Sequence, residues 1–126
     1  MTISDLKNKL SDLAFKVTQM KETEPPFSGE YNDLYANGKY VCVCCELPLF
    51  SSKNKFNSKS GWPSFYQPIN EDCLKYIEDN SHNMVRVEVC CKKCNSHLGH
   101  VFDDGPKPTF KRYCINSVSM RFVEDE

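Results

Sequence analysis

Two Cys-x-x-Cys units constrain the fold of this chain more than any other feature of its sequence. They are Cys42–Cys45 in CVCC and Cys91–Cys94 in CKKC, and residues 46–90 separate them. A CxxC turn directs two thiolates onto one cation, and two such turns supply the four ligands of a closed, tetrahedral zinc site. We therefore expect one structural zinc ion held by Cys42, Cys45, Cys91 and Cys94, with a substructure inserted between the two units.

Two other uses of the cysteines remain open, namely disulfide bonds and a metal site formed by Cys91, Cys94, His97 and His100. The chain has eight cysteines among 126 residues, and its N-terminus lacks the apolar core and cleavage site of a signal peptide. We therefore expect a reducing, cytoplasmic location, which disfavours disulfides. Four protein ligands leave no open position on zinc, so the ion would stabilise the fold without entering the chemistry.

The composition is that of a globular protein with a net charge near zero. Hydrophobic residues make up 40% and charged residues 26% of the chain, and the formal net charge is -1. This balance offers no basic field for nucleic acid, and no apolar run approaches the length of a membrane span. We expect one domain over residues 1–126, a monomer without nucleic-acid or membrane partners.

Hydrophobic periodicity divides the chain into a helical and a β part. Apolar residues recur at spacings of three and four over residues 3–20, which predicts an amphipathic helix within an N-terminal segment 1–21. Pro25 and Pro26 then interrupt regular structure. Residues 22–126 carry β signals, including an Asn37-Gly38 pair typical of a two-residue hairpin turn. The expected fold is mainly β, a small antiparallel sheet system after a helix.

Three segments are predicted to be strands of this sheet system. In MVRVEVC the valines alternate with Arg86 and Glu88, as in a half-exposed strand, and HLGHVF and RYCINSVSMRF are further candidates. In the last of these the apolar positions change parity. We therefore expect a bulge near Asn116 or burial of both faces.

Cys114 lies between two polar residues on one face of the last predicted strand. Alternate side chains of a strand share a face, so Arg112, Cys114 and Asn116 point the same way. A lone cysteine is usually a small buried hydrophobe. A neighbouring guanidinium favours the reactive thiolate instead, which makes Cys114 a candidate nucleophile.

Two other motifs carry candidate functional side chains. HLGH places His97 and His100 on either side of a Leu-Gly turn, where two imidazoles could converge as proton donors. SGWPSF contains the only tryptophan, Trp62, between turn-forming residues. Its ring could form a pocket wall, and aromatic edges attract sulfur and methyl groups.

Five ordered motifs resemble the B-type methionine sulfoxide reductases. They are TEPPFSGEY, GKYVC, SGWPSFY, HLGHVFDDGP and RYCINS, and the resemblance spans nearly the whole chain from about residue 22. The resemblance implies two small antiparallel sheets with a structural zinc. It also implies reduction of the R epimer of methionine sulfoxide to methionine in oxidised proteins, and it leaves open whether the free amino acid is a second substrate.

The same resemblance implies roles for individual residues. Cys114 matches the nucleophile, which is left as a sulfenic acid, and His97 and His100 match the pair that supplies protons. Arg112 and Asn116 would hold the thiolate and its surroundings. Trp62 would receive the ε-methyl group of the substrate, with Phe102 also in the substrate site.

The chain departs from many relatives at Ser60, where those relatives carry a resolving cysteine before Gly-Trp-Pro. A serine hydroxyl cannot form a disulfide. Thioredoxin or a small thiol could reduce the sulfenic acid directly, which we favour, while Cys44, Cys73 and Cys90 remain candidates for an internal disulfide.

Two other classes of function compete with this one. A zinc-stapled β module that binds a protein partner explains the CxxC pairs but gives no reason for Arg112, Cys114, Asn116, Trp62 and the two histidines to occur together. A thiol peroxidase would share the reactive cysteine but has no evident use for Trp62.

Overall fold

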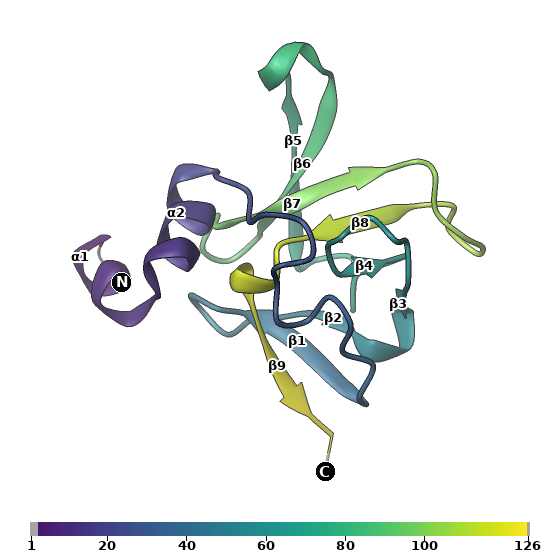
Figure 1. The fold of residues 1–126 in the computed structure, drawn as a ribbon, viewed down its shortest axis with the longest axis horizontal. Coiled ribbons are helices and arrows are strands. Elements are labelled where there is room, and N and C mark those ends of the chain that lie inside the picture. The colour runs from purple at the N-terminus through teal and green to yellow at the C-terminus, as the bar shows by residue number, and fades with distance from the viewer. Residues whose placement is uncertain (1–2, 126) are drawn as a thin grey trace.

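The fold is mainly β, with two antiparallel sheets and a helical N-terminal segment, as predicted (Figure 1). A computed structural model describes residues 3–125; residues 1, 2 and 126, which the predicted domain includes, lie outside the described residues. The smaller sheet has the order β2-β1-β9, with β1 at Gly38–Cys42, β2 at Pro48–Ser51 and β9 at Met120–Glu124.

The larger sheet contains six strands in the order β3-β4-β8-β7-β6-β5. Its strands are β3 at Lys55–Phe56, β4 at Ser64–Phe65, β5 at Leu74–Asp79, β6 at Arg86–Cys91, β7 at His97–Phe102 and β8 at Arg112–Ile115. Short 3-10 helices occupy Ser52–Asn54, Ser81–Asn83 and Ser117–Ser119. The β5–β6 hairpin projects from the body at the top of Figure 1.

The N-terminal segment forms two helices rather than the single helix predicted over residues 3–20. Helix α1 spans Ile3–Lys9 and α2 spans Asp12–Met20. Between them the Ser11 hydroxyl accepts a hydrogen bond from the Ala14 N–H at 3.1 Å, so Ser11 caps α2 and stops α1. The break lets both helices bury one apolar side, through Leu6, Leu10, Ala14 and Val17.

The hairpin predicted at Asn37-Gly38 is wrong. Residues 32–36 form turns and loop, and Gly38 is instead the first residue of β1. A Cβ at this position would lie 2.4 Å from the Val123 carbonyl oxygen and 2.6 Å from the Phe122 ring. The glycine is therefore needed for close packing of β1 against β9 rather than for a turn.

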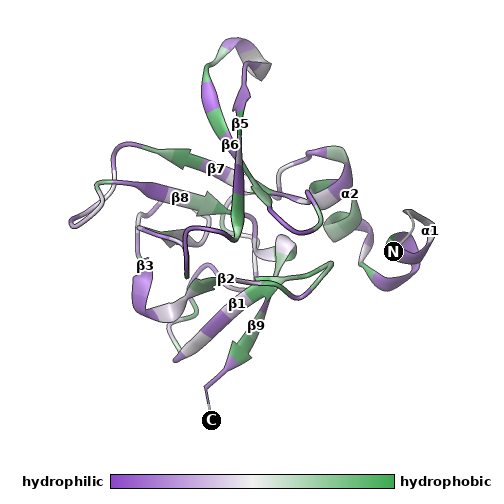
Figure 2. Cartoon of the chain, turned by 180° about the vertical axis from the view of Figure 1, so that it is seen from behind, coloured by the Kyte–Doolittle hydropathy of each residue, from purple (hydrophilic) through white to green (hydrophobic). Residues whose placement is uncertain are grey.

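Stacked aromatic rings fill the space between the two sheets. Tyr40, Phe50 and Phe65 are fully buried, and the Phe50 and Phe65 rings stack at 4.4 Å between centroids. Tyr40 meets Phe65 edge-on at 5.2 Å. Hydrophobic segments of α2, β1 and β9 belong to the same core (Figure 2).

After Cys114 the apolar residues move to the other alternate positions because the chain passes from the larger sheet to the smaller one. Strand β8 ends at Ile115, the 3-10 helix Ser117–Ser119 follows, and β9 joins the other sheet. The two halves of the predicted strand therefore face different surroundings. A helical turn takes the place of the bulge, while the alternative expectation, burial of both faces, is confirmed because Ile115, Asn116 and Ser117 are all buried.

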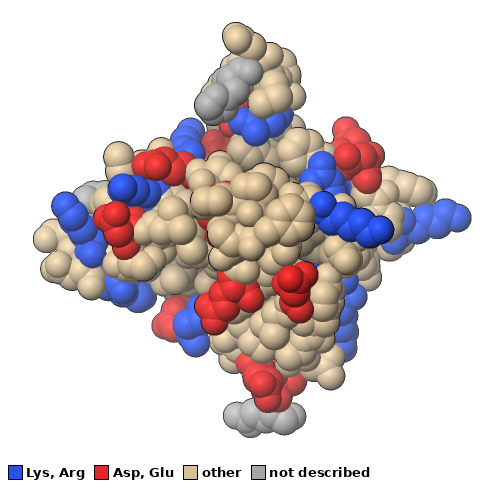
Figure 3. Space-filling model, in the orientation of Figure 1, with Lys and Arg blue, Asp and Glu red and all other residues tan. Residues whose placement is uncertain are grey.

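On the face shown in Figure 3, acidic and basic side chains are interspersed, in keeping with the formal net charge of -1. Within residues 3–125, no helix is both long and apolar enough to cross a membrane.

Candidate functional site

The two CxxC units form matching turns at the ends of strands in different sheets. Cys42 ends β1 and Cys91 ends β6. In the first turn the Glu46 N–H donates to the Cys42 carbonyl at 2.8 Å, and in the second the Asn95 N–H donates to the Cys91 carbonyl at 2.8 Å. Each turn thereby returns its second cysteine, Cys45 or Cys94, toward the first.

The four predicted cysteines fit a tetrahedral metal site. Their sulfurs all lie within 4.8 Å of one another, with Cys42 and Cys94 at 3.6 Å and Cys45 and Cys91 at 3.5 Å. A tetrahedral zinc ion with Zn–S bonds of ~2.3 Å requires sulfurs about 3.8 Å apart. The alternative ligand set is not assembled, because His97 and His100 instead bind carboxylates, at 2.7 Å each.

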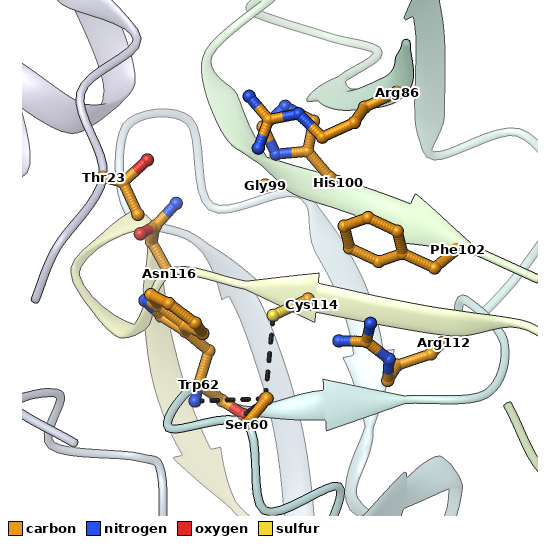
Figure 4. A pocket seen from close by; sticks show the side chains of 10 residues that line it. All are labelled: Thr23, Ser60, Trp62, Arg86, Gly99, His100, Phe102, Arg112, Cys114 and Asn116. Atoms are coloured by element: carbon orange, nitrogen blue, oxygen red, sulfur yellow. Dashed lines mark hydrogen bonds between the residues drawn. The ribbon is translucent and has the colours of Figure 1, made fainter. Parts of the chain in front are cut away.

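Cys114 lies in a pocket of about 290 Å³ on the larger sheet (Figure 4). Arg112, Cys114 and Asn116 all line this pocket, so their predicted common face is confirmed. Strand β8 lies between β4 and β7, and Cys114 is paired with Ser64 on one side and His100 on the other. Other lining residues are Thr23, Ser60, Trp62, Arg86, Gly99, His100 and Phe102.

Burial determines the charge state of the Cys114 thiol. Burial raises its pKa above the ordinary value of 9.0, while a hydrogen bond from Ser60, 3.9 Å away, and the Arg112 charge lower it by less. Arg112 therefore favours the thiolate, as predicted, but burial of the thiol has the larger effect on its pKa. The resting thiol is protonated at neutral pH.

This electrostatic balance predicts a pH profile. Alkylation of Cys114 by iodoacetamide should accelerate as pH rises, with a midpoint above 9.0, because the thiolate is the reactive form. Replacing Arg112 by methionine should move the midpoint higher still, because it removes a charge that favours the thiolate. Mass spectrometry of the Cys114 peptide measures both profiles, and a midpoint below 9.0 in the unaltered protein would contradict the burial argument.

The Arg112 side chain is fixed by two contacts. Its Nε and Nη2 atoms donate to the two carboxylate oxygens of Asp104 at 2.9 and 3.2 Å. The guanidinium also lies over the Phe102 ring, 4.4 Å from the centroid. The cation therefore stays at the pocket wall in one orientation.

The two histidines lie on strand β7 rather than on either side of a turn. Residues three apart on a regular strand face opposite ways. Here the register shifts between Val89 and Cys90, which pair with Gly99 and His97, so Leu98 is the extra residue of a bulge. The bulge brings the imidazoles of His97 and His100 together, with ring centroids 5.5 Å apart.

The histidines differ in access to the pocket. His100 lines it, whereas His97 is 3% exposed and is not among the lining residues. Burial lowers the pKa of His97, and the Glu88 carboxylate, 2.7 Å from Nδ1, opposes this only in part. Among the described residues the buried Nε2 atom of His97 has no hydrogen-bond partner.

Glu88 is a buried carboxylate that sequence reasoning missed. It is 1% exposed, and it also accepts from Cys90 at 3.3 Å and from the Lys21 ammonium at 3.1 Å. Burial favours a higher pKa for Glu88, but the bonds from His97, Cys90 and Lys21 together lower it, so the group is ionised.

The alternation in VRVEV identified the strand, but burial does not follow the alternation. Val85 and Val87 are 77% and 39% exposed, whereas Val89 is fully buried. The face with Arg86 and Glu88 is directed toward the histidines. No local signal distinguishes a solvent-facing glutamate from one that binds a histidine of a neighbouring strand.

Hydrogen bonds to Glu24, in the connector before β1, fix two predicted site residues, Trp62 and Asn116. The Trp62 Nε1–H donates to the Glu24 carbonyl at 3.0 Å, and the Glu24 N–H donates to the Asn116 Oδ1 atom at 3.0 Å. The Asn116 amide in turn donates to the Leu98 carbonyl at 2.9 Å. Trp62 and Asn116 are thereby fixed on one side of Cys114 (Figure 4).

The three spare cysteines are buried away from the pocket. Cys44, Cys73 and Cys90 are 2–3% exposed, and among the described residues Cys114 is the one cysteine that lines the pocket. The Cys73 thiol donates to the Asn70 carbonyl at 3.4 Å. Burial and the Glu88 carboxylate raise the pKa of Cys90 to about 12. Ser60 occupies the position next to Cys114 instead, with its hydroxyl 3.9 Å from the sulfur.

Comparison with known proteins agrees with the motifs and the geometry. Residues 10–124 match the SelR domain. The chain is 54% identical over 122 residues to the peptide methionine sulfoxide reductase MsrB of Thioalkalivibrio sulfidiphilus (strain HL-EbGR7), covering 97% of this chain and 89% of that protein. The resemblance inferred from the ordered motifs is thereby confirmed, and the chain belongs to the SelR family, the B-type methionine sulfoxide reductases.

Proposed function

We propose that the protein reduces the R epimer of methionine sulfoxide in oxidised proteins, and also in the free amino acid, to methionine. The observation that supports this most directly is the pocket in which the Cys114 thiol, the imidazole of His100 and the rings of Trp62 and Phe102 meet. The name of the relative from Thioalkalivibrio sulfidiphilus, a peptide methionine sulfoxide reductase, supports the part of the proposal that concerns oxidised proteins.

Cys114 is the nucleophile in this proposal. Its sulfur attacks the sulfoxide sulfur and a proton reaches the oxygen. The hydroxyl group then moves to the Cys114 sulfur as the substrate S–O bond and the new S–S bond break, and methionine leaves. The net change converts one thiol and one sulfoxide into one sulfenic acid and one thioether. The methionine sulfur gains the two electrons that the Cys114 sulfur loses, and the oxygen remains on Cys114.

The lining residues have distinct tasks. Trp62 and Phe102 offer aromatic surface to the thioether sulfur and its methyl group. His100 carries the proton to the oxygen, since it lines the pocket. His97 does not line the pocket, but its ring packs against that of His100 and helps to hold it in place. Arg112 stabilises the thiolate as it forms, and Asn116 holds the pocket floor through Glu24 and Leu98.

An external thiol regenerates Cys114 in this scheme. None of Cys44, Cys73 and Cys90 lines the pocket, and the Ser60 hydroxyl cannot form a disulfide. A first thiol attacks the sulfenic acid, releases water and leaves a mixed disulfide; a second thiol restores Cys114 and carries away the disulfide. A thioredoxin dithiol supplies both equivalents.

Cys42, Cys45, Cys91 and Cys94 would hold one zinc ion in this protein, as the sulfur spacing supports. With four protein ligands the ion would cross-link the two sheets and take no part in the reaction. It would join the end of β1 in the smaller sheet to the end of β6 in the larger one.

A single-turnover experiment tests the proposed reaction and the recycling route together. Fully reduced protein is mixed anaerobically with the separated R and S epimers of N-acetylmethionine sulfoxide, and N-acetylmethionine and free thiols are counted. We expect one equivalent of N-acetylmethionine from the R epimer alone and the loss of one thiol. No product from either epimer would refute the reaction, and the loss of two thiols would refute direct reduction.

A further inference from the structure

Two side chains of the pocket converge on one carboxylate outside it, that of Asp79. The Nε2 atom of His100 lies 2.7 Å from Oδ2 of Asp79, and the Arg86 guanidinium lies 3.5 Å from the same oxygen. The other oxygen, Oδ1, accepts the Ser81 N–H at 2.9 Å. Both oxygens therefore have partners, and the partners come from three different parts of the chain.

Strand pairing explains how Asp79 reaches this position. Asp79 is the last residue of β5 and pairs with Arg86, the first residue of β6. Strand β6 lies between β5 and β7, and Glu88 of β6 pairs with His100 of β7. Asp79 therefore reaches diagonally across β6 to His100, from the projecting hairpin seen in Figure 1.

The bond to Asp79 determines which nitrogen of His100 carries hydrogen. The hydrogen bond from His100 and those from the Ser81 backbone and side chain lower the pKa of Asp79, so its carboxylate is ionised and only accepts hydrogen bonds. The nitrogen 2.7 Å away must be a donor. Neutral His100 therefore has its proton on Nε2 and a bare Nδ1.

We infer that Asp79 is a positioning residue that holds His100 in the Nε2–H tautomer, so that Nδ1 is the nitrogen that exchanges protons in the pocket. When His100 is protonated, Nδ1 gains a hydrogen while Nε2 keeps its bond to Asp79. Delivery of that hydrogen to a sulfoxide oxygen then requires no rotation of the ring. The catalytic part of this inference rests on the proposed function.

An asparagine at position 79 should reverse the tautomer. Its amide oxygen is expected to keep the bond from the Ser81 N–H, which directs the NH₂ group toward His100 and Arg86. An amide N–H next to Nε2 needs an acceptor, so the imidazole must carry its proton on Nδ1. The same substitution has this effect on the histidine of serine protease triads.

Imidazole ¹⁵N spectra of the full-length, metal-loaded protein under mildly alkaline conditions test the tautomer directly. We expect a protonated Nε2 for His100 in the unaltered protein and a protonated Nδ1 in Asp79→Asn, with the His100→Gln variant used to assign the signals. Glu78→Gln is the matched control, because Glu78 is the exposed neighbour of Asp79 on β5. A protonated Nδ1 in the unaltered protein, or no change in Asp79→Asn, overturns the inference.

Rates of methionine formation test the catalytic part. In single turnovers with the R epimer, Asp79→Asn should react about 10- to 100-fold more slowly, part of the 10²–10⁴ that a positioned acid or base contributes. The substrate concentration at half-maximal rate should change little, Asp79→Glu should recover part of the rate, and Glu78→Gln should match the unaltered protein.

The outcomes separate this inference from the proposed function. A reversed tautomer with an unchanged rate, or an equal loss of rate in Glu78→Gln, overturns the catalytic part of the inference. Reduction of neither epimer by the unaltered protein refutes the proposed function, while the spectra still decide the tautomer.

Discussion

Replacing Cys114 by serine is expected to reduce methionine formation below detection, a loss of about 10⁴-fold or more. The hydroxyl group is close to the thiol in size, but it has no sulfur that can give up two electrons and accept the sulfoxide oxygen as a sulfenic acid. Methionine released in an anaerobic single turnover with the R epimer measures the effect. The variant should fold normally, since Cys114 is half-buried at the pocket surface.

Serine variants of three other cysteines test whether the loss of activity depends on the position of Cys114 or follows from the loss of any thiol. Cys44→Ser, Cys73→Ser and Cys90→Ser make the same atomic change at thiols that do not line the pocket. Each should complete one stoichiometric round of reduction. Full methionine formation by Cys114→Ser would refute its assignment as the nucleophile, and loss of the first round in Cys73→Ser would show that a second thiol takes part.

Removal of the proposed zinc ion is expected to unfold the protein. Structural zinc sites contribute an apparent ~10–16 kcal/mol, which is comparable with the ~5–15 kcal/mol that stabilises a typical domain. The four cysteines join strands of both sheets, and α1 and α2 cover the two turns, with Lys9 bound to the Cys44 carbonyl and Gln19 to Ser96. Loss of the ion should therefore destabilise both sheets and both helices.

Adjacent cysteines provide the control for this experiment. Cys91→Ser removes a ligand, whereas Cys90→Ser changes the neighbouring residue, which binds Glu88 and is outside the cluster. The first variant should lose both its zinc and its cooperative thermal transition, and the second should keep both. Circular dichroism with metal analysis measures this, in the variants and in chelator-treated protein. An unchanged transition after verified metal loss would contradict the structural role.

Local patterns predicted the two features of this protein that depend on spacing alone. The doubled CxxC units identified the four clustered cysteines, because each turn is a short-range structure and only a partner turn completes the site. Alternation along β8 placed Arg112, Cys114 and Asn116 on one face, because a strand directs every second side chain the same way.

Other features depend on which strands become neighbours, and the tertiary structure decided them. The bulge at Leu98 brings His97 and His100 together, and the packing of β9 requires the glycine at position 38. Asp79 and Glu88 look like surface carboxylates in the sequence, yet each binds a histidine of another strand at 2.7 Å.

By itself the sequence determined the mainly β class and the cluster of four cysteines, and it identified Cys114 as the candidate nucleophile, because these follow from residue type and spacing along one segment. Only the tertiary structure decided that burial keeps the Cys114 thiol protonated and that Ser60, rather than a second thiol, lies beside it. The physical reason is that burial and ion pairing depend on contacts between strands far apart in the chain, which the periodicity of any single strand does not contain.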